Sequence, residues 1–145
     1  GLSFDAWVYH PQLGDVIDLA RAFSGTQIVL NHVGGPIGLG RYKGKRDEVF
    51  ADWSGRIREL ASCPNVHVKL GGLGMDIGPF VAHMQRPAPP SSAEIAAAWK
   101  PWIEACIEAL QRAPSSSQRA SAVISSSSMA STRACMVATL PASLR

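Results

Sequence analysis

The chain alternates three times between a short β-type run and an amphipathic helical run, and this order constrains the fold more than any other feature. The β-type runs lie at residues 2–10, 27–32 and 65–70, and proline or glycine follows each of them. The helical runs extend to residue 23 and over residues 47–62 and 92–110. A β-α-β-α-β-α order predicts parallel strands that are joined by right-handed crossovers. We therefore expect an α/β fold.

The third helical run carries two signals that act in opposite directions. Ser91 and Glu94 have the spacing of a capping box, which favours a helix start. Pro101 lies inside the run, where it lacks an amide hydrogen and crowds the preceding turn. We expect a break or kink that gives segments of about 92–99 and 101–110.

The second β-type run, in the stretch QIVLNHVGGP, ends in a histidine, which is a candidate catalytic or metal-binding residue. Ile28 and Leu30 belong to the strand core, and a side-chain period of two places His32 on their face. An imidazole at the carboxyl end of a strand, beside a glycine loop, has the position of catalytic groups in barrel enzymes. A neutral imidazole can bind a metal ion or polarise a carbonyl. The alternative is a histidine whose hydrogen bonds only complete the strand end.

Two further polar residues follow from the same alternation. His10 ends the first β-type run on the face of Ala6 and Val8, where it is a second ligand, a substrate contact or the start of a turn. Lys69 shares a face with His67 and lies nearer the carboxyl end of the third run. If the aliphatic face of that run meets the helices, His67 and Lys69 point into the barrel. Lys69 then either binds a substrate carboxylate or forms a salt bridge.

Four segments of the chain together resemble one known family. They are LSFDAWVYHPQL, QIVLNHVGGPIG, GKRDEVFADWSGRIRELASCPNVHVKLGGLGM and AAAWKPWIEACIEAL. They look like the second half of amidohydrolase-related (amidohydrolase 2) metal-dependent hydrolases, which are (β/α)8 TIM barrels and include sugar lactonases and dicarboxylate lactonases. A complete barrel takes about 250 residues. The resemblance covers roughly residues 1–110 and implies a partial barrel of three β-α units, which we assign to strands five to seven.

The resemblance also implies a reaction. The parent would hydrolyse a lactone or related small carboxylate by water attack on a carbonyl. Either histidines or a divalent metal ion such as zinc would stabilise the oxyanion. His32 would line the active site as a catalytic residue or one metal ligand, with His10 and Lys69 as substrate contacts. A decarboxylase on the same scaffold stays open.

The sequence departs from this family in two ways. The superfamily's first-strand HxH pair is absent, and no aspartate follows Asp76 to activate water. We therefore expect the chain to be inactive alone. The competing reading is a small non-enzymatic α/β binding module with a flexible serine-rich tail.

Composition divides the chain near residue 112. Residues 1–108 hold all 11 acidic residues and ten of the 14 basic ones, so the net charge of +3 arises in the tail. Serine takes ten of positions 113–145, and such a composition favours disorder. We expect a partial barrel over 1–111 and a tail over 112–145 that is disordered or frame-shifted.

Charge and cysteine usage exclude several other classes. The tail arginines are spread out, which argues against nucleic-acid binding. Because the longest apolar runs are far shorter than 18 residues, we expect no membrane span. The three cysteines are Cys63, Cys106 and Cys135; they form no CxxC pair and indicate a reduced, cytoplasmic setting.

Overall fold

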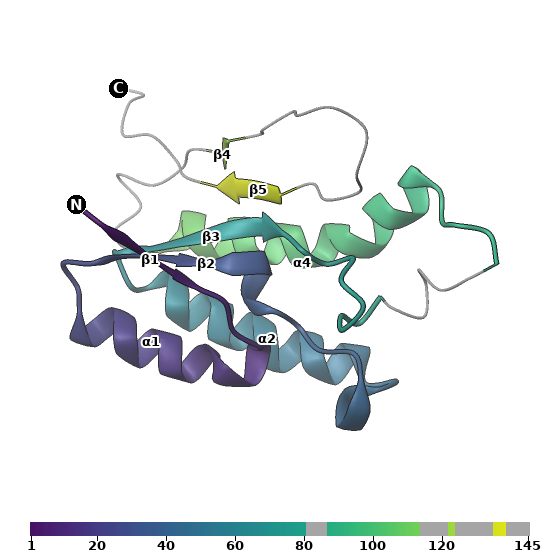
Figure 1. Cartoon of the computed structure of the whole chain (residues 1–145), viewed down its shortest axis with the longest axis horizontal. Coiled ribbons are helices and arrows are strands. Elements are labelled where there is room, and N and C mark those ends of the chain that lie inside the picture. The colour runs from purple at the N-terminus through teal and green to yellow at the C-terminus, as the bar shows by residue number, and fades with distance from the viewer. Residues whose placement is uncertain (81–86, 114–121, 124–134, 139–145) are drawn as a thin grey trace.

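A computed structural model describes residues 1–80, 87–113, 122–123 and 135–138. Its strands are β1 (Ser3–Ala6), β2 (Gln27–Leu30), β3 (Val66–Gly71), β4 (Ala122–Val123) and β5 (Cys135–Ala138), in the sheet order β1-β2-β3-β5-β4. The first three strands are parallel, and β5 runs antiparallel to both β3 and β4. The long helices α1 (Leu13–Ala22), α2 (Arg46–Ala61) and α4 (Ser92–Arg112) pack against one face of the parallel strands (Figure 1). This mixed α/β arrangement is consistent with part of a TIM barrel.

Alternation along the parallel strands explains which face the helices cover. Six strand residues that point to the helices are at most 4% exposed: Ala6, Ile28, Leu30, Val66, Val68 and Leu70. Phe4, on the same face of the edge strand β1, is 50% exposed. The six buried residues pack with Leu13, Ile17, Trp53 and Ile57 in a single core. The aliphatic face of β3 therefore meets the helices, which is the condition on which the orientation of His67 and Lys69 depended. The opposite face, here called the open face, carries Asp5, Gln27, His67 and Lys69.

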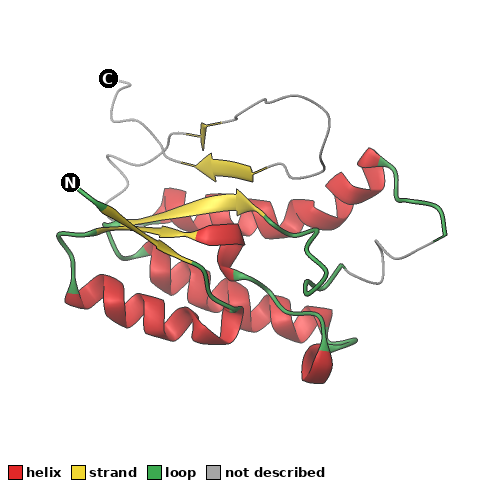
Figure 2. Ribbon diagram, in the orientation of Figure 1, coloured by secondary structure: helices red, strands yellow, loops and turns green. Residues whose placement is uncertain are grey.

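Two of the parallel strands are shorter than the sequence pattern predicts. β1 ends at Ala6 and β2 at Leu30, whereas we expected strands through His10 and His32. Both histidines lie in 3-10 turns, η1 (His10–Gln12) and η2 (Asn31–Gly34). Figure 2 shows η2 as a helical turn directly at the end of β2. Period-two reasoning therefore fails for both residues, because it holds only while the backbone stays extended.

The expected break at Pro101 is wrong, because α4 runs through it as one helix of 21 residues. The alternative expectation, a kink within a continuous helix, stays a prediction. Three features hold the helix together. Ser91 and Glu94 form the predicted capping box at its start. Trp102 and Cys106 are buried just after the proline. The guanidinium of Arg46 donates to the carbonyl of Ala98 at 3.0 Å, in the turn that a helix proline disturbs.

The segment beyond residue 112 is described only in part. β4 and β5 lie in it, so two short stretches are assigned to the sheet. The other residues of 114–145 fall outside the described ranges, and the expectation of disorder or a frame shift stays a prediction. No helix among the described residues is long and apolar enough to cross a membrane.

Candidate functional site

The carboxyl ends of β2 and β3 meet at His32 and Gly72. Gly72 follows β3 with a φ of +73°. A Cβ atom on Gly72 would lie 2.5 Å from Cβ and Cγ of His32 and 2.6 Å from its Nδ1. The imidazole therefore lies directly against the glycine backbone, in space that only a residue without a side chain leaves free. His32 itself is partly buried.

The backbone at His32 and Val33 has an uncommon conformation. Their φ angles are 51° and 49°, in the left-handed region that L residues seldom adopt, and Val33 is β-branched. Such a residue costs of order 1–3 kcal/mol and persists where its surroundings fix it. Trp53 Nε1 donates to the Val33 carbonyl at 2.7 Å, and the Gly35 amide donates to the His32 carbonyl at 3.0 Å. The valine side chain is fully buried, so packing and hydrogen bonds together hold the histidine in place.

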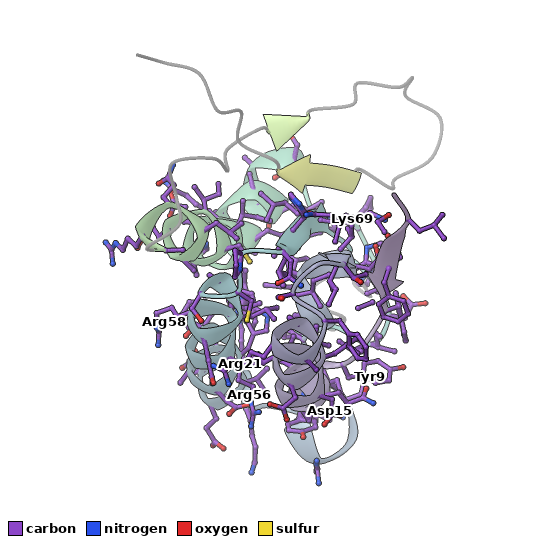
Figure 3. The ribbon with its side chains drawn as sticks, turned by 90° about the vertical axis from the view of Figure 1, so that its left-hand side faces the viewer. Tyr9, Asp15, Arg21, Arg56, Arg58 and Lys69 are labelled. Atoms are coloured by element: carbon purple, nitrogen blue, oxygen red, sulfur yellow. The ribbon has the colours of Figure 1, made fainter. Side chains whose placement is uncertain are left out.

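Lys69 lies on the open face, on the side of the sheet away from α1 (Figure 3). Its Nζ donates to Oδ2 of Asp5 at 2.7 Å, across the intervening strand β2. The lysine side chain is 24% exposed and the aspartate 52%. Asp5 is a partner of Lys69 that the sequence analysis did not single out. In the sequence, the one indication of its role is an acidic side chain on the face of β1 opposite to Ala6. That position points to Lys69 only once the pairing of β1, β2 and β3 is known.

His10 is placed differently from both residues. It is 1% exposed, its amide donates to the Gly35 carbonyl at 3.1 Å, and its Nδ1 accepts from the Ile37 amide at 3.2 Å. Its ring meets the Tyr42 ring edge-on at 4.8 Å. Burial lowers the pKa of His10, against an opposing effect of Asp52 and with smaller lowering effects of Arg56 and Arg41. The ring is therefore neutral near pH 7, with its hydrogen on Nε2.

The predicted residues do not assemble a complete metal site. Catalytic zinc takes three protein ligands in most enzymes. Within the described ranges, no group of three or more His, Cys, Asp or Glu side chains has an arrangement that could hold a metal ion. The Nδ1 lone pair of His10 already accepts a hydrogen bond. The residues present therefore do not fit a metal ion by themselves.

Comparison with known proteins adds the relatives of this chain. A protein-family model described as amidohydrolase matches residues 1–128, further than the segments on which the resemblance rested. The uncharacterized protein y4mH of Sinorhizobium fredii is 35% identical over 88 residues, which cover 60% of this chain and 27% of that protein. The L-fucono-1,5-lactonase of Burkholderia ambifaria is 37% identical over 79 residues, which cover 54% of this chain and 24% of the lactonase.

A solved structure agrees with the sequence matches. The crystal structure of an amidohydrolase from Burkholderia multivorans with bound zinc superposes with a TM-score of 0.52 at 26% identity. The superposition covers 80% of this chain and 34% of that protein. This chain thus spans about a quarter of the curated relatives and about a third of the solved one. Because the family model matches most of its length, the chain belongs to the amidohydrolase family.

Proposed function

We propose that this chain is part of a hydrolase that opens a lactone or a related small carboxylate, and that its share of the active site is the carboxyl edge of β2 and β3 with the open face. The observation that carries the proposal is the left-handed backbone of His32 and Val33. Strained residues cluster at functional sites, and this one presents an imidazole at the end of a parallel strand. The similarity to an L-fucono-1,5-lactonase supports the substrate class.

The described residues suggest distinct roles in binding. His32, held against Gly72, would polarise the scissile carbonyl or contribute one metal ligand. Lys69 would attract a carboxylate or hydroxyl group of the substrate, with Asp5 fixing the direction of its ammonium group. Asp5 is then a positioning residue, because it acts through Lys69.

The same proposal makes the chain inactive alone. Water attack needs a base, and the sequence has no aspartate after Asp76 for that task. The described residues also hold no complete metal site, whereas the solved relative binds zinc. We propose that a divalent metal in the complete hydrolase depends on ligands beyond the described residues, with His32 as one donor at most. No step of the reaction is assigned to that metal.

The test combines an assay with a binding map. The 145-residue chain is mixed with 1,4- and 1,5-aldonolactones and with their ring-opened acids, and ring opening is followed by proton release. We expect ring opening at the rate of the buffer, together with weak binding of the acids that shifts the NMR signals of the His32 ring and Lys69 Nζ. His32→Asn and Lys69→Met should each weaken that binding.

Lys43→Met is the matched control for Lys69→Met, because Lys43 is an exposed lysine in the loop before α2, outside the strands that form the open face. Binding that leaves the His32 and Lys69 signals unmoved would overturn the proposed site. Ring opening well above the buffer rate would overturn the expected inactivity. Tight binding without ring opening, even when the longest polypeptide from the gene is assayed, would favour the non-enzymatic binding module.

A further inference from the structure

The chain segment that follows His32 passes directly beside the segment that follows β1. Gly35, just after η2, has a φ of +51°. A Cβ atom on this glycine would overlap the Val8 carbonyl oxygen and lie 3.3 Å from Cα of Tyr9. The backbones of the two segments are therefore in contact, which the missing side chain of glycine allows. His10 comes directly after Tyr9 and begins η1, so it lies at this crossing.

His10 holds the segment after His32 by two hydrogen bonds. Its amide donates to the Gly35 carbonyl at 3.1 Å, and its Nδ1 accepts from the Ile37 amide at 3.2 Å. The Gly35 amide in turn donates to the His32 carbonyl at 3.0 Å. Gly35 thus joins His10 to His32 through two backbone hydrogen bonds in series. Because His10 is 1% exposed, water does not compete for its bonds.

Other elements fix the two ends of the same segment. Trp53 of α2 donates from Nε1 to the Val33 carbonyl at 2.7 Å. The Gly38 amide donates to the carbonyl of Ile77, in the loop after β3, at 2.8 Å. Between Val33 and Gly38, the hydrogen bonds that reach the segment from another element come, among the described residues, from His10. His10 is therefore the contact that fixes the middle of the segment.

A contact of this kind matters because the backbone at this point is strained. His32, Val33, Gly34 and Gly35 are four consecutive residues with positive φ, at 51°, 49°, 73° and 51°. Strained residues persist only where their surroundings over-determine them. Without an acceptor at position 10, the Ile37 amide would lose its partner in a part-buried place, which is unfavourable. The segment would relieve that loss by moving, and the backbone of His32 would move with it.

We propose that His10 is a positioning residue of the proposed active site. Through Gly35 and Ile37 it fixes the backbone of His32, and thereby the place of the imidazole against Gly72. This inference rests on the proposed function, in which His32 polarises the scissile carbonyl or contributes one metal ligand. It replaces the roles of substrate contact and second ligand that the sequence suggested for His10. A residue that is 1% exposed offers a substrate almost no surface, and its Nδ1 lone pair is already in use.

Two substitutions of His10 in the full chain test this role. The side chains of asparagine and leucine have the same branched shape, but only asparagine offers an uncharged acceptor for the Ile37 amide. We expect His10→Leu to shift the NMR signals of the His32 ring. It should also weaken the binding of the ring-opened acids roughly tenfold, the factor that corresponds to one net hydrogen bond. His10→Asn should return both the signals and the affinity to near those of the original chain.

Val66→Ala is the matched control for a purely structural effect. Val66 is 1% exposed and pairs with Ile28, near the amino end of β2 and thus away from His32. Its truncation should lower the stability of the core and leave the His32 ring signals in place. A second measurement, on the original chain, is the nitrogen–nitrogen coupling across the hydrogen bond from the Ile37 amide to His10 Nδ1. Together with His10→Asn, it decides the case in which His10→Leu fails to fold.

The outcomes separate this inference from the proposed function. Unmoved His32 signals in His10→Leu, or the absence of the coupling, would overturn the positioning role and leave the proposed active site in place. A His10→Asn chain as impaired as His10→Leu would overturn it too, and so would an acid that shifts the His10 ring signals more than those of His32. If the original chain binds no acid while the His32 signals still follow the acceptor at position 10, the proposed function fails and the positioning role stands.

Discussion

The two faces of the same three strands differ in what their side chains do. On the helix-covered face, the alternate residues of β2 and β3 are aliphatic and almost completely buried. On the open face, most of the residues between them are polar, and four of these pair across strands: Lys69 with Asp5, and His67 with Gln27. Natural parallel sheets are covered on both faces, so an open polar face fits one part of a larger barrel. The comparison indicates that one face supplies the buried apolar contacts, whereas the other presents polar groups that the helices do not cover.

The free edge of the sheet supports this view. β1 pairs with β2 on one side, and the large apolar residues along it are unusually exposed: Leu2 at 94%, Phe4 at 50% and Trp7 at 49%. Apolar residues beside a free strand edge are typical of a surface that another element would cover. The part of the amidohydrolase fold that this chain contains is thus open at this edge.

The largest expected difference in stability is between substitutions at two neighbouring residues of β2. Leu30→Ala empties a fully buried position on the helix-covered face and should reduce the free energy of unfolding by about 3 kcal/mol. Val29→Ala, at a partly exposed position on the open face, should cost about 1 kcal/mol or less. Urea unfolding followed by circular dichroism measures both. Equal losses would mean that both faces are packed alike.

The next effect concerns the glycine against His32. Gly72→Ala should destabilise by about 1–2 kcal/mol for the left-handed backbone alone, with a further loss because its Cβ would meet the imidazole. Gly40→Ala is the matched control, since Gly40 also has a positive φ of 56° but no atom near its Cβ position. Only the first variant should shift the His32 ring signals. If both variants cost the same and neither moves those signals, the close contact is not present in solution.

A smaller difference should show in the pH dependence of stability. Burial lowers the pKa of His10 below the 6.5 of an unfolded chain, so the unfolded state binds the proton first as the pH falls. The contribution of the neutral ring is complete above pH 6.5 and is lost as the pH falls below it toward the folded-state pKa. His10→Gln, which keeps an uncharged acceptor for Ile37, should flatten that part of the profile. His67→Gln on the open face leaves His10 intact and should retain the slope; the same slope in both variants would contradict a buried neutral His10.

These residues also show where sequence reasoning works and where it stops. The parallel order of the strands and the inward aliphatic face of β3 could be predicted, because both follow from patterns inside continuous elements. His10 and His32 were misplaced because their strands end earlier, at Ala6 and Leu30. The Gly-Gly-Pro sequence predicted a change of chain direction after β2. It did not predict that His32 and Val33 themselves adopt the left-handed conformation. That conformation depends on distant contacts, such as the hydrogen bond from Trp53 to the Val33 carbonyl.

The smallest expected effect is on the pair that joins β1 to β3. Asp5 and Lys69 are 64 positions apart, so their contact depends on the strand register and could not be read from local sequence. Partly exposed ion pairs contribute between 0 and about 1 kcal/mol. A double-mutant cycle with Asp5→Asn and Lys69→Met should therefore give a coupling energy well below 1 kcal/mol in urea unfolding. The same cycle, measured on the binding of the ring-opened acids, should give a larger coupling energy than it gives in unfolding. The reason is that without Asp5 the ammonium group of Lys69 no longer has a fixed direction. A large coupling in stability with none in binding would show that the pair is structural, and the open face would then lose its role in the proposed site.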